Sequence, residues 1–175
     1  MNGKAWIKNK IIYVAFLDSS YFAANYLDMI KRQIIGAIDK IDFPEFELFD
    51  LGCRIDTGAT SSAIHCQNII VVQANGIETI SFELLDAKHP SYNKQTYCTK
   101  DFTRKKVRSS FGQEEVRYAI TTDVVLFNTT YTTQFTLADR VKMRYPVLIG
   151  RNLLRQGFVV DVRKKNTSFK HKSHL

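Results

Sequence analysis

From residue 34 onward the sequence consists of short runs of Ile, Val, Thr, Phe and Tyr, separated by Gly, Asn, Asp and Ser. β-Branched and aromatic residues are typical of strands, and the small polar residues between them are typical of turns. Strands are therefore predicted at residues 34–41, 46–55, 68–74, 78–85, 106–110, 116–127, 130–137 and 158–162. Many short strands with little helix indicate an all-β barrel or sandwich.

Local signals also place the turns and one helix. The Asn-Gly dipeptide at 75–76 favours a hairpin, because both residues tolerate positive φ, and Asn-Thr at 128–129 is expected to turn a second one. A short helix is predicted at 152–156, closed by Gly157. Residues 89–105 are the least regular, and we expect them to form a mobile loop.

Three regions are predicted: a helical extension at 1–33, a core domain at 34–162 and a basic tail at 163–175. The extension is predicted to be helical because apolar side chains recur at helical spacing between residues 19 and 33. The net charge is +8, of which the extension carries +3 and the tail +5, so the core domain is neutral. A basic tail is able to bind RNA or an acidic partner, or to stay solvated.

The cysteines and the N-terminus bear on the cellular compartment. Three cysteines, Cys53, Cys66 and Cys98, are an odd number without close spacing, which favours a reducing compartment. The apolar segment 11–17 follows three lysines, but it is at the lower length limit of a signal peptide. No apolar run approaches the roughly 18 residues of a membrane span. We expect a cytoplasmic protein without a membrane partner, with periplasmic export as the alternative.

The sharpest local feature is the Asp-Thr-Gly-Ala segment at 56–59, directly after an apolar strand. The carboxylate ends the strand, and Gly58 lets the backbone turn tightly. A lone Asp-Thr-Gly also fits an ordinary Asx turn that closes a hairpin. Far downstream, however, the apolar run 145–149 ends in Gly-Arg at 150–151 and leads into the predicted helix. The two segments together are much more specific than either alone.

This pair of segments resembles the retropepsin-like aspartic peptidases, in which the second strand crosses behind the Asp loop and braces it. Residues 35–162 are similar, more closely, to the bacterial family labelled ATP-dependent zinc proteases, whose members have a retropepsin-like domain. Two residues depart from the usual pattern, Ser61 in place of Thr and Asn152 in place of Asp. The residues that carry the resemblance are Gly36, Asp42-Phe43-Pro44, Ile55-Asp56-Thr57-Gly58-Ala59, Ser61-Ser62-Ala63-Ile64-His65, Val107, Ser110, Gly112, Arg117-Tyr118, Arg140, Met143, Tyr145-Pro146 and Leu148-Ile149-Gly150-Arg151.

The resemblance implies a closed barrel of the acid-protease type, with Asp56, Thr57 and Gly58 as the catalytic segment. Such peptidases use two carboxylates about 3 Å apart that share one proton. Because the chain has one Asp-Thr-Gly, the second carboxylate is expected from another copy of the chain, which makes a homodimer. The nearest internal alternatives, Asp139 and Asp161, lack the Thr-Gly that would shape the loop.

Further roles are expected for the residues around these segments. Arginines are candidates for binding substrate carboxylates, because guanidinium pairs with carboxylate bidentately; for Arg151 the alternative is a structural role. His65 is expected to be a packed, hydrogen-bonded histidine. The predicted substrate-binding residues are Ala59, Arg117, Arg140 and Arg151, and the predicted loop-supporting residues are Ser61, Ser62, His65 and Gly150.

The label of the family is not matched by metal or nucleotide motifs. The sequence has no His-Glu-x-x-His and no Cys-x-x-Cys that would give structural zinc geometry. It also lacks the Gly-x-x-x-x-Gly-Lys-Ser/Thr loop that would hold ATP phosphates. We therefore expect no metal and no cofactor.

The sequence thus favours an aspartic-type peptidase in which Asp56 activates water for amide hydrolysis. Relatives of the family often accompany glutamate ligases that add glutamates to a ribosomal protein, so the resemblance implies acidic or glutamate-rich peptide substrates. One alternative is a non-catalytic module that binds an acidic peptide, RNA or a ribosomal partner. A third hypothesis is a metal-dependent hydrolase.

Overall fold

The computed structural model describes residues 5–7, 10–12, 32–108 and 114–172, and the chain divides into two compact units, Met1–Arg32 and Gln33–Leu175. In the first unit, β1 (Ala5–Ile7) pairs antiparallel with β2 (Lys10–Ile12). The helix predicted within 19–33 lies outside the described residues, apart from its end. None of the helices in the described ranges is long and apolar enough to cross a membrane.

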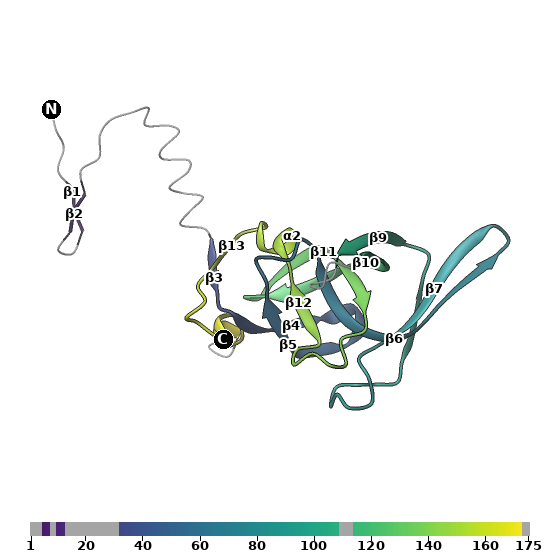
Figure 1. Ribbon diagram of the computed structural model, residues 1–175. Coiled ribbons are helices and arrows are strands. Elements are labelled where there is room, and N and C mark those ends of the chain that lie inside the picture. Colours follow the sequence, from purple (N-terminus) through teal and green to yellow (C-terminus); the bar gives the residue numbers. More distant parts are fainter. Residues whose placement is uncertain (1–4, 8–9, 13–31, 109–113, 173–175) are drawn as a thin grey trace. The chain divides into compact units, whose positions relative to one another are not determined.

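The second unit is built almost entirely from strands, as predicted (Figure 1). Its strands are β3 (Gln33–Ile35), β4 (Ile38–Phe43), β5 (Leu48–Ile55), β6 (Ser62–Ala74), β7 (Ile77–Leu84), β8 (Thr96–Thr99), β9 (Phe102–Arg108), β10 (Glu114–Leu126), β11 (Thr129–Ala138), β12 (Val147–Ile149) and β13 (Phe158–Val160). Its helices are a 3-10 turn, η1 (Pro44–Phe46), and two short α-helices, α2 (Arg151–Leu154) and α3 (Thr167–Lys172).

The main sheet closes on itself. Its strands pair in the order β11-β10-β4-β5-β12-β6, and β11 also pairs with β6 in parallel, from Phe135 opposite Ser62 to Ala138 opposite His65. This ring of strands confirms the all-β, retropepsin-like fold that the sequence predicted. From the ring, β6 runs on into a long hairpin with β7, which projects from the body of the unit (Figure 1).

The hairpin turns follow from residues that adopt positive φ. Asn75 and Gly76 have φ of 53° and 76°, as the predicted hairpin between β6 and β7 requires. The turn between β10 and β11 lies one residue earlier than predicted, at Phe127 and Asn128, with φ of 51° and 57°. The reason is the strand register, because Leu126 pairs with Thr129 and leaves only these two residues for the turn.

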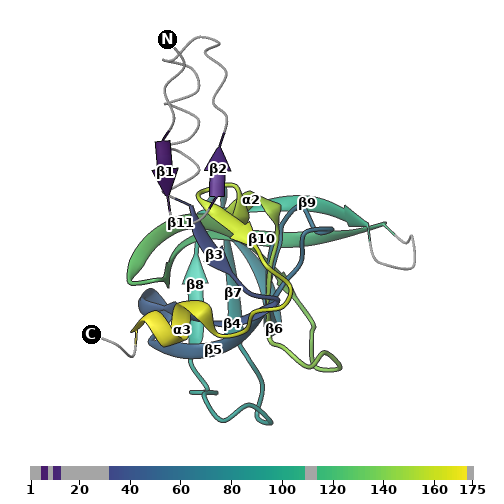
Figure 2. The ribbon, with the colours of Figure 1, turned by 90° about the vertical axis from the view of Figure 1, so that its left-hand side faces the viewer.

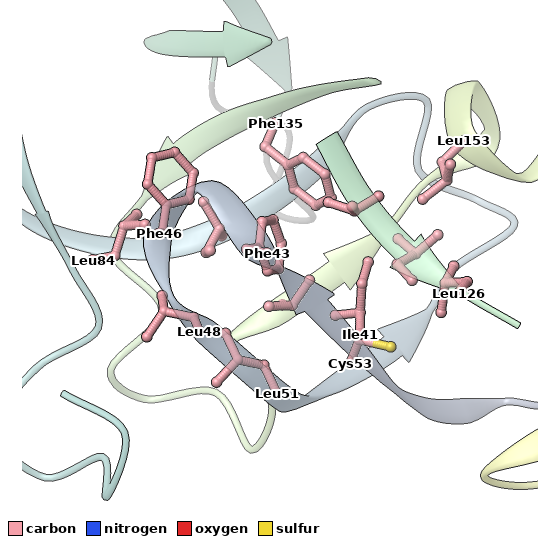
Figure 3. Close-up of a cluster of buried hydrophobic side chains, with 14 of the residues drawn as sticks. Ile41, Phe43, Phe46, Leu48, Leu51, Cys53, Leu84, Leu126, Phe135 and Leu153 are labelled. Atoms are coloured by element: carbon pink, nitrogen blue, oxygen red, sulfur yellow. The ribbon is translucent and has the colours of Figure 1, made fainter. Parts of the chain in front are cut away.

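The core lies inside the ring and is filled by aromatic and aliphatic side chains (Figure 3). Phe43 and Phe135 are fully buried and pack edge to face, with ring centroids 5.0 Å apart. Ile41 and Leu51 are also fully buried. Burial of side chains of this size contributes about 1.5–3 kcal/mol each, so the ring is a rigid base for the loops at its ends.

Two predicted segments differ from the structure. The strand predicted at 34–41 is divided into β3 and β4 at Gly36, where a Cβ would lie 2.2 Å from the Lys164 carbonyl oxygen. The loop predicted at 89–105 contains β8 and the start of β9. Its order comes from Tyr97, whose hydroxyl donates to the Phe46 carbonyl (3.0 Å) and whose ring packs on Phe46 at 4.9 Å.

The C-terminal segment, predicted as a basic tail, carries a helix that contacts β4 (Figure 2). The buried carboxylate of Asp39 accepts hydrogen bonds from the Thr167 hydroxyl (2.9 Å) and from the amides of Ser168 (3.0 Å) and Phe169 (3.1 Å), so it caps α3. The short helix predicted at 152–156 corresponds to α2, and α3 is a second helix that the sequence did not predict. A helix so short forms only where tertiary contacts hold it, and its capping residue lies far away in sequence.

Candidate functional site

The Asp-Thr-Gly segment forms a tight loop at the end of β5. The Asp56 amide donates to the Ile149 carbonyl (2.9 Å), which ties the start of the loop to β12. Asp56 Oδ1 accepts hydrogen bonds from the amides of Gly58 (2.9 Å) and Ala59 (3.2 Å). None of the described residues donates to the other oxygen, Oδ2. The loop therefore fixes the half-buried carboxylate and leaves one of its oxygens for water or for another carboxylate.

The strand behind this loop is β12, as the resemblance implied. β12 pairs in parallel with β5, up to Ile149 opposite Ile55, and antiparallel with β6. Gly150 follows it and touches the backbone of Ser61, because a Cβ on Gly150 would lie 2.6 Å from the Ser61 carbonyl carbon and oxygen. The Gly150 amide donates to the buried Ser62 hydroxyl (3.1 Å). Gly150 and Ser62 thus support the loop from behind.

Arg151 holds the loop from the other side. Its Nη1 donates to the carbonyls of Thr57 (2.9 Å) and Gly58 (2.6 Å), and its Nη2 donates to the Thr60 hydroxyl (2.7 Å). The Arg151 amide adds a bond to the Ala59 carbonyl (2.9 Å). The guanidinium that the sequence assigned to substrate binding is therefore engaged by the Asp loop itself. Arg151 acts as a positioning residue in this structure.

The remaining residues of the loop lie at the surface. Thr57 and Gly58 are exposed, and Ala59 and Ser61 are half-buried. A surface loop of this kind leaves room for a substrate backbone or for a second copy of the loop. Neither is part of this single chain, so the predicted roles of Thr57, Gly58 and Ala59 stay predictions.

His65 is buried and hydrogen-bonded through both ring nitrogens. Nδ1 accepts a hydrogen bond from the Arg140 amide (2.9 Å), so the proton is assigned to Nε2, which donates to Asp86 Oδ2 (2.9 Å). The His65 amide also donates to the Pro146 carbonyl (2.8 Å). His65 therefore joins three segments of the chain. Sequence reasoning missed Asp86, because one aspartate in a polar turn carries no local signal of a partner 21 residues away.

The Asp86 carboxylate gives a testable pH dependence of stability. Hydrogen bonds from the Lys88 amide and from His65 hold the pKa of Asp86 below its ordinary value. A pKa lowered by folding contributes stability that is present above the unfolded pKa, about 3.9, and lost as the pH falls through the folded pKa. We expect the urea midpoint of the wild type to fall below about pH 4 more steeply than that of Asp86→Asn.

The control for this prediction is Asp101→Asn, which removes an exposed carboxylate. Its urea midpoints between pH 2 and 6 should follow the wild-type pH dependence. Identical pH slopes for the wild type and Asp86→Asn would contradict the assignment of this carboxylate.

One of the predicted arginines, Arg140, interacts electrostatically with the Asp loop, and Arg117 interacts with Arg140. Burial lowers the pKa of the Arg140 guanidinium, the charge of Arg117 lowers it further, and the Asp56 carboxylate raises it. Arg140 Nε donates to the Tyr145 carbonyl (3.3 Å). Arg117 forms an ion pair with Glu115. The structure therefore places Arg140 near Asp56 and Arg117 near Arg140, whereas Arg151 belongs to the loop itself.

The donor set near the site does not fit a zinc ion. Among the described residues, no group of three or more His, Cys, Asp or Glu side chains is placed to hold a metal. Burial raises the pKa of the Cys66 thiol to about 12, which disfavours the thiolate that binds zinc. Both nitrogens of His65 are already hydrogen-bonded.

Comparison with known proteins supports the fold and identifies the family. The model of a family described as retropepsin-like aspartic endopeptidase RimB matches residues 34–171. Two similar curated proteins, both named probable alpha-L-glutamate ligase, come from Desulfotalea psychrophila (31% identity over 136 residues) and Shewanella pealeana (32% over 135 residues). Each match covers 75% of this chain but only 28% and 29% of those proteins, so the chain spans less than a third of their length.

A solved structure supports the fold alone. The crystal structure of a Legionella pneumophila protein of unknown function is 23% identical, has a TM-score of 0.57, and covers 77% of this chain and 97% of its own. The family model says more than the fold, because the residues that it matches, 34–171, include the Asp loop, β12 with Gly150 and Arg151, and most of α3. The chain belongs to the RimB-like family of retropepsin-like aspartic endopeptidases.

Proposed function

We propose that the protein is an aspartic-type peptidase in which Asp56 activates water for amide hydrolysis. The observation that carries the proposal is the Asp loop. Asp56 Oδ1 is fixed by two backbone amides, while Oδ2 receives no hydrogen bond from the described residues. Gly150 and Arg151 brace this loop through the backbone. A carboxylate held in one orientation with an accessible oxygen is suited to take a proton from water.

The chemistry needs a second carboxylate. In the proposed reaction the ionised carboxylate takes a proton from water, and the water oxygen attacks the carbonyl carbon of the scissile amide. The protonated carboxylate donates to the carbonyl oxygen, and the C–N bond breaks as the nitrogen receives a proton. The two aspartates considered as the second carboxylate within this chain interact with other residues. Asp161 is hydrogen-bonded to Arg163 (3.0 Å), and Asp139 lies 3.8 Å from His65. The proposed partner is therefore Asp56 of a second copy.

The proposed substrates are acidic peptides, including glutamate-rich ones. The support is the positive charge of Arg140 near Asp56 and the names of the curated relatives, which refer to glutamate ligation. A carboxylate-rich chain is attracted to such a surface, and a guanidinium binds carboxylates bidentately.

The proposal is tested by incubating the full chain with a glutamate-rich peptide and reading products by mass spectrometry. Light scattering over the same concentrations gives the solution mass. We expect cleavage whose specific rate rises with the dimer fraction. A monomer that cleaves equally well at every concentration would contradict the two-chain site. Binding of the peptide without cleavage would favour the non-catalytic binding module instead.

Mixing of subunits gives a sharper prediction for the two-chain site. Adding Asp56→Asn chains to a fixed amount of wild type, with time to exchange, should produce dimers with only one Asp56. The activity should then fall to about one half at an equal ratio and to about one fifth at a fourfold excess, because pairing is statistical. The assay uses peptide in excess over all chains, so that competition for substrate does not contribute.

The control for the mixing experiment adds Asp139→Asn chains, which keep Asp56 and replace an exposed carboxylate. These chains should not inhibit. Activity that is indifferent to added Asp56→Asn would place the complete site in one chain.

A further inference from the structure

A basic hollow lies beside His65, between the loop after β7 and the loop that joins β11 to β12. Its volume is about 150 Å³. Pockets for drug-sized ligands start at roughly 300 Å³, so this hollow has room for one side chain rather than for a whole ligand. Three cationic side chains line it, those of Lys88, Arg140 and Arg144, and we call it the basic hollow.

The charge of the basic hollow is only partly neutralised from within. Its one carboxylate, Asp86, accepts hydrogen bonds from His65 Nε2 (2.9 Å) and from the Lys88 amide (2.8 Å) and interacts electrostatically with the Lys88 charge, so it offsets one of the three positive charges. In the part of the chain that the structure describes, no acceptor pairs with Lys88 Nζ or with the guanidinium of Arg144. The Arg140 guanidinium donates only through Nε within the same residues, which leaves its terminal nitrogens available.

The wall of the basic hollow also has an apolar part. Val141 and Met143 are 42% and 61% exposed at its edge, and Pro146 completes this side. An apolar wall next to cations that keep free N–H donors suits a side chain that has methylene groups below a terminal carboxylate. Burial of one more CH₂ group favours glutamate over aspartate by about fourfold.

We propose that the basic hollow is a subsite that binds the side-chain carboxylate of an acidic peptide, with Lys88, Arg140 and Arg144 as its donors. The free guanidinium nitrogens match the two oxygens of a carboxylate. The role of the basic hollow as a substrate subsite rests on the proposed peptidase function, whereas its binding of a carboxylate does not.

Arg140 connects the basic hollow to the catalytic loop. Its backbone amide donates to His65 Nδ1 (2.9 Å), so the position of this segment is fixed by a buried residue of β6. Its guanidinium is close enough to Asp56 for the two charges to interact. A peptide with its scissile bond at Asp56 is thus able to extend one acidic side chain toward the basic hollow.

The test is binding of a fluorescent glutamate-rich peptide, measured by anisotropy in an Asp56→Asn background so that the peptide stays intact. The variant is the double substitution Lys88→Gln and Arg144→Gln. Both side chains are exposed and neither donates to the described backbone, so the fold should be retained, which thermal melting checks. We expect affinity to fall roughly 10- to 100-fold, the range for hydrogen bonds to charged groups. A matched peptide with glutamine in place of glutamate should bind with the same affinity to the Asp56→Asn protein with and without the double substitution.

The matched control is Lys142→Gln, which removes one charge from the same exposed loop without lining the basic hollow. If Lys142→Gln weakens binding as much as Arg144→Gln does alone, the effect is long-range charge and the subsite is overturned. Unchanged affinity of the double variant overturns it as well.

Cleavage assays with Asp56 intact separate this inference from the proposed function. Charge-selective binding at the basic hollow without cleavage would leave the subsite standing and reject the peptidase. Cleavage that is lost in Asp56→Asn but unchanged when Lys88 and Arg144 are substituted would support the peptidase and reject the subsite.

Discussion

Asp56→Asn should lower kcat/KM for a cleavable acidic peptide by at least roughly 10²- to 10⁴-fold, the contribution of a positioned general base. Asparagine keeps the side-chain shape and an oxygen that can accept the amides of Gly58 and Ala59, so the loop should keep its conformation. The amide cannot take a proton from water, however. The measurement is the rate of peptide cleavage, read by mass spectrometry or by a fluorogenic peptide.

The result is informative only if the variant folds like the wild type. The circular dichroism spectrum should be unchanged. The free energy of unfolding, measured with urea, should change by less than about 0.5 kcal/mol, as is usual for surface substitutions. Asp139→Asn is the matched control, because its carboxylate is 76% exposed and lies near His65 rather than in the loop. Full activity of a folded Asp56→Asn chain would reject Asp56 as the general base.

The parts of the structure that could be predicted from the sequence are those with local causes. The strands follow from β-branched runs, and the turn at Asn75 and Gly76 follows from the tolerance of both residues for positive φ. The Asp loop and the strand that ends at Gly150 could be identified because their residues recur together in one known family. In each case the signal lies within a few adjacent residues, which a single sequence displays.

The parts that could not be predicted depend on contacts between distant residues. Helix α3 is capped by Asp39, which is 128 residues from Thr167, and its own sequence has no helical pattern of apolar residues. For Arg151 a structural role was one of two alternatives, but its partners, the carbonyls of Thr57 and Gly58, could not be predicted. Strand β8 has only four residues, too few to show an alternating pattern. Only the fold supplies these partners.

Gly150→Ala should destabilise the domain by about 3 kcal/mol or more, a large part of the 5–15 kcal/mol that such domains have. The backbone at Gly150 has φ of −97°, which any residue adopts, so the cost is not conformational. It is steric, because the new Cβ would meet the carbonyl carbon and oxygen of Ser61 at 2.6 Å, and these atoms belong to backbone rather than to a flexible side chain.

The shift that relieves this contact must move β12 away from the Asp loop or the loop away from β12. Either movement lengthens the bond from the Gly150 amide to Ser62 Oγ, now 3.1 Å, and costs about 0.5–1.5 kcal/mol more. Urea unfolding measures the loss, and peptide cleavage should fall with it because Asp56 is displaced. Gly52→Ala is the control, since its Cβ would meet only the Tyr145 ring at 3.4 Å, an ordinary contact, and should change stability by less than about 1 kcal/mol. Equal midpoints for Gly150→Ala and Gly52→Ala would mean that the contact with Ser61 does not hold the loop.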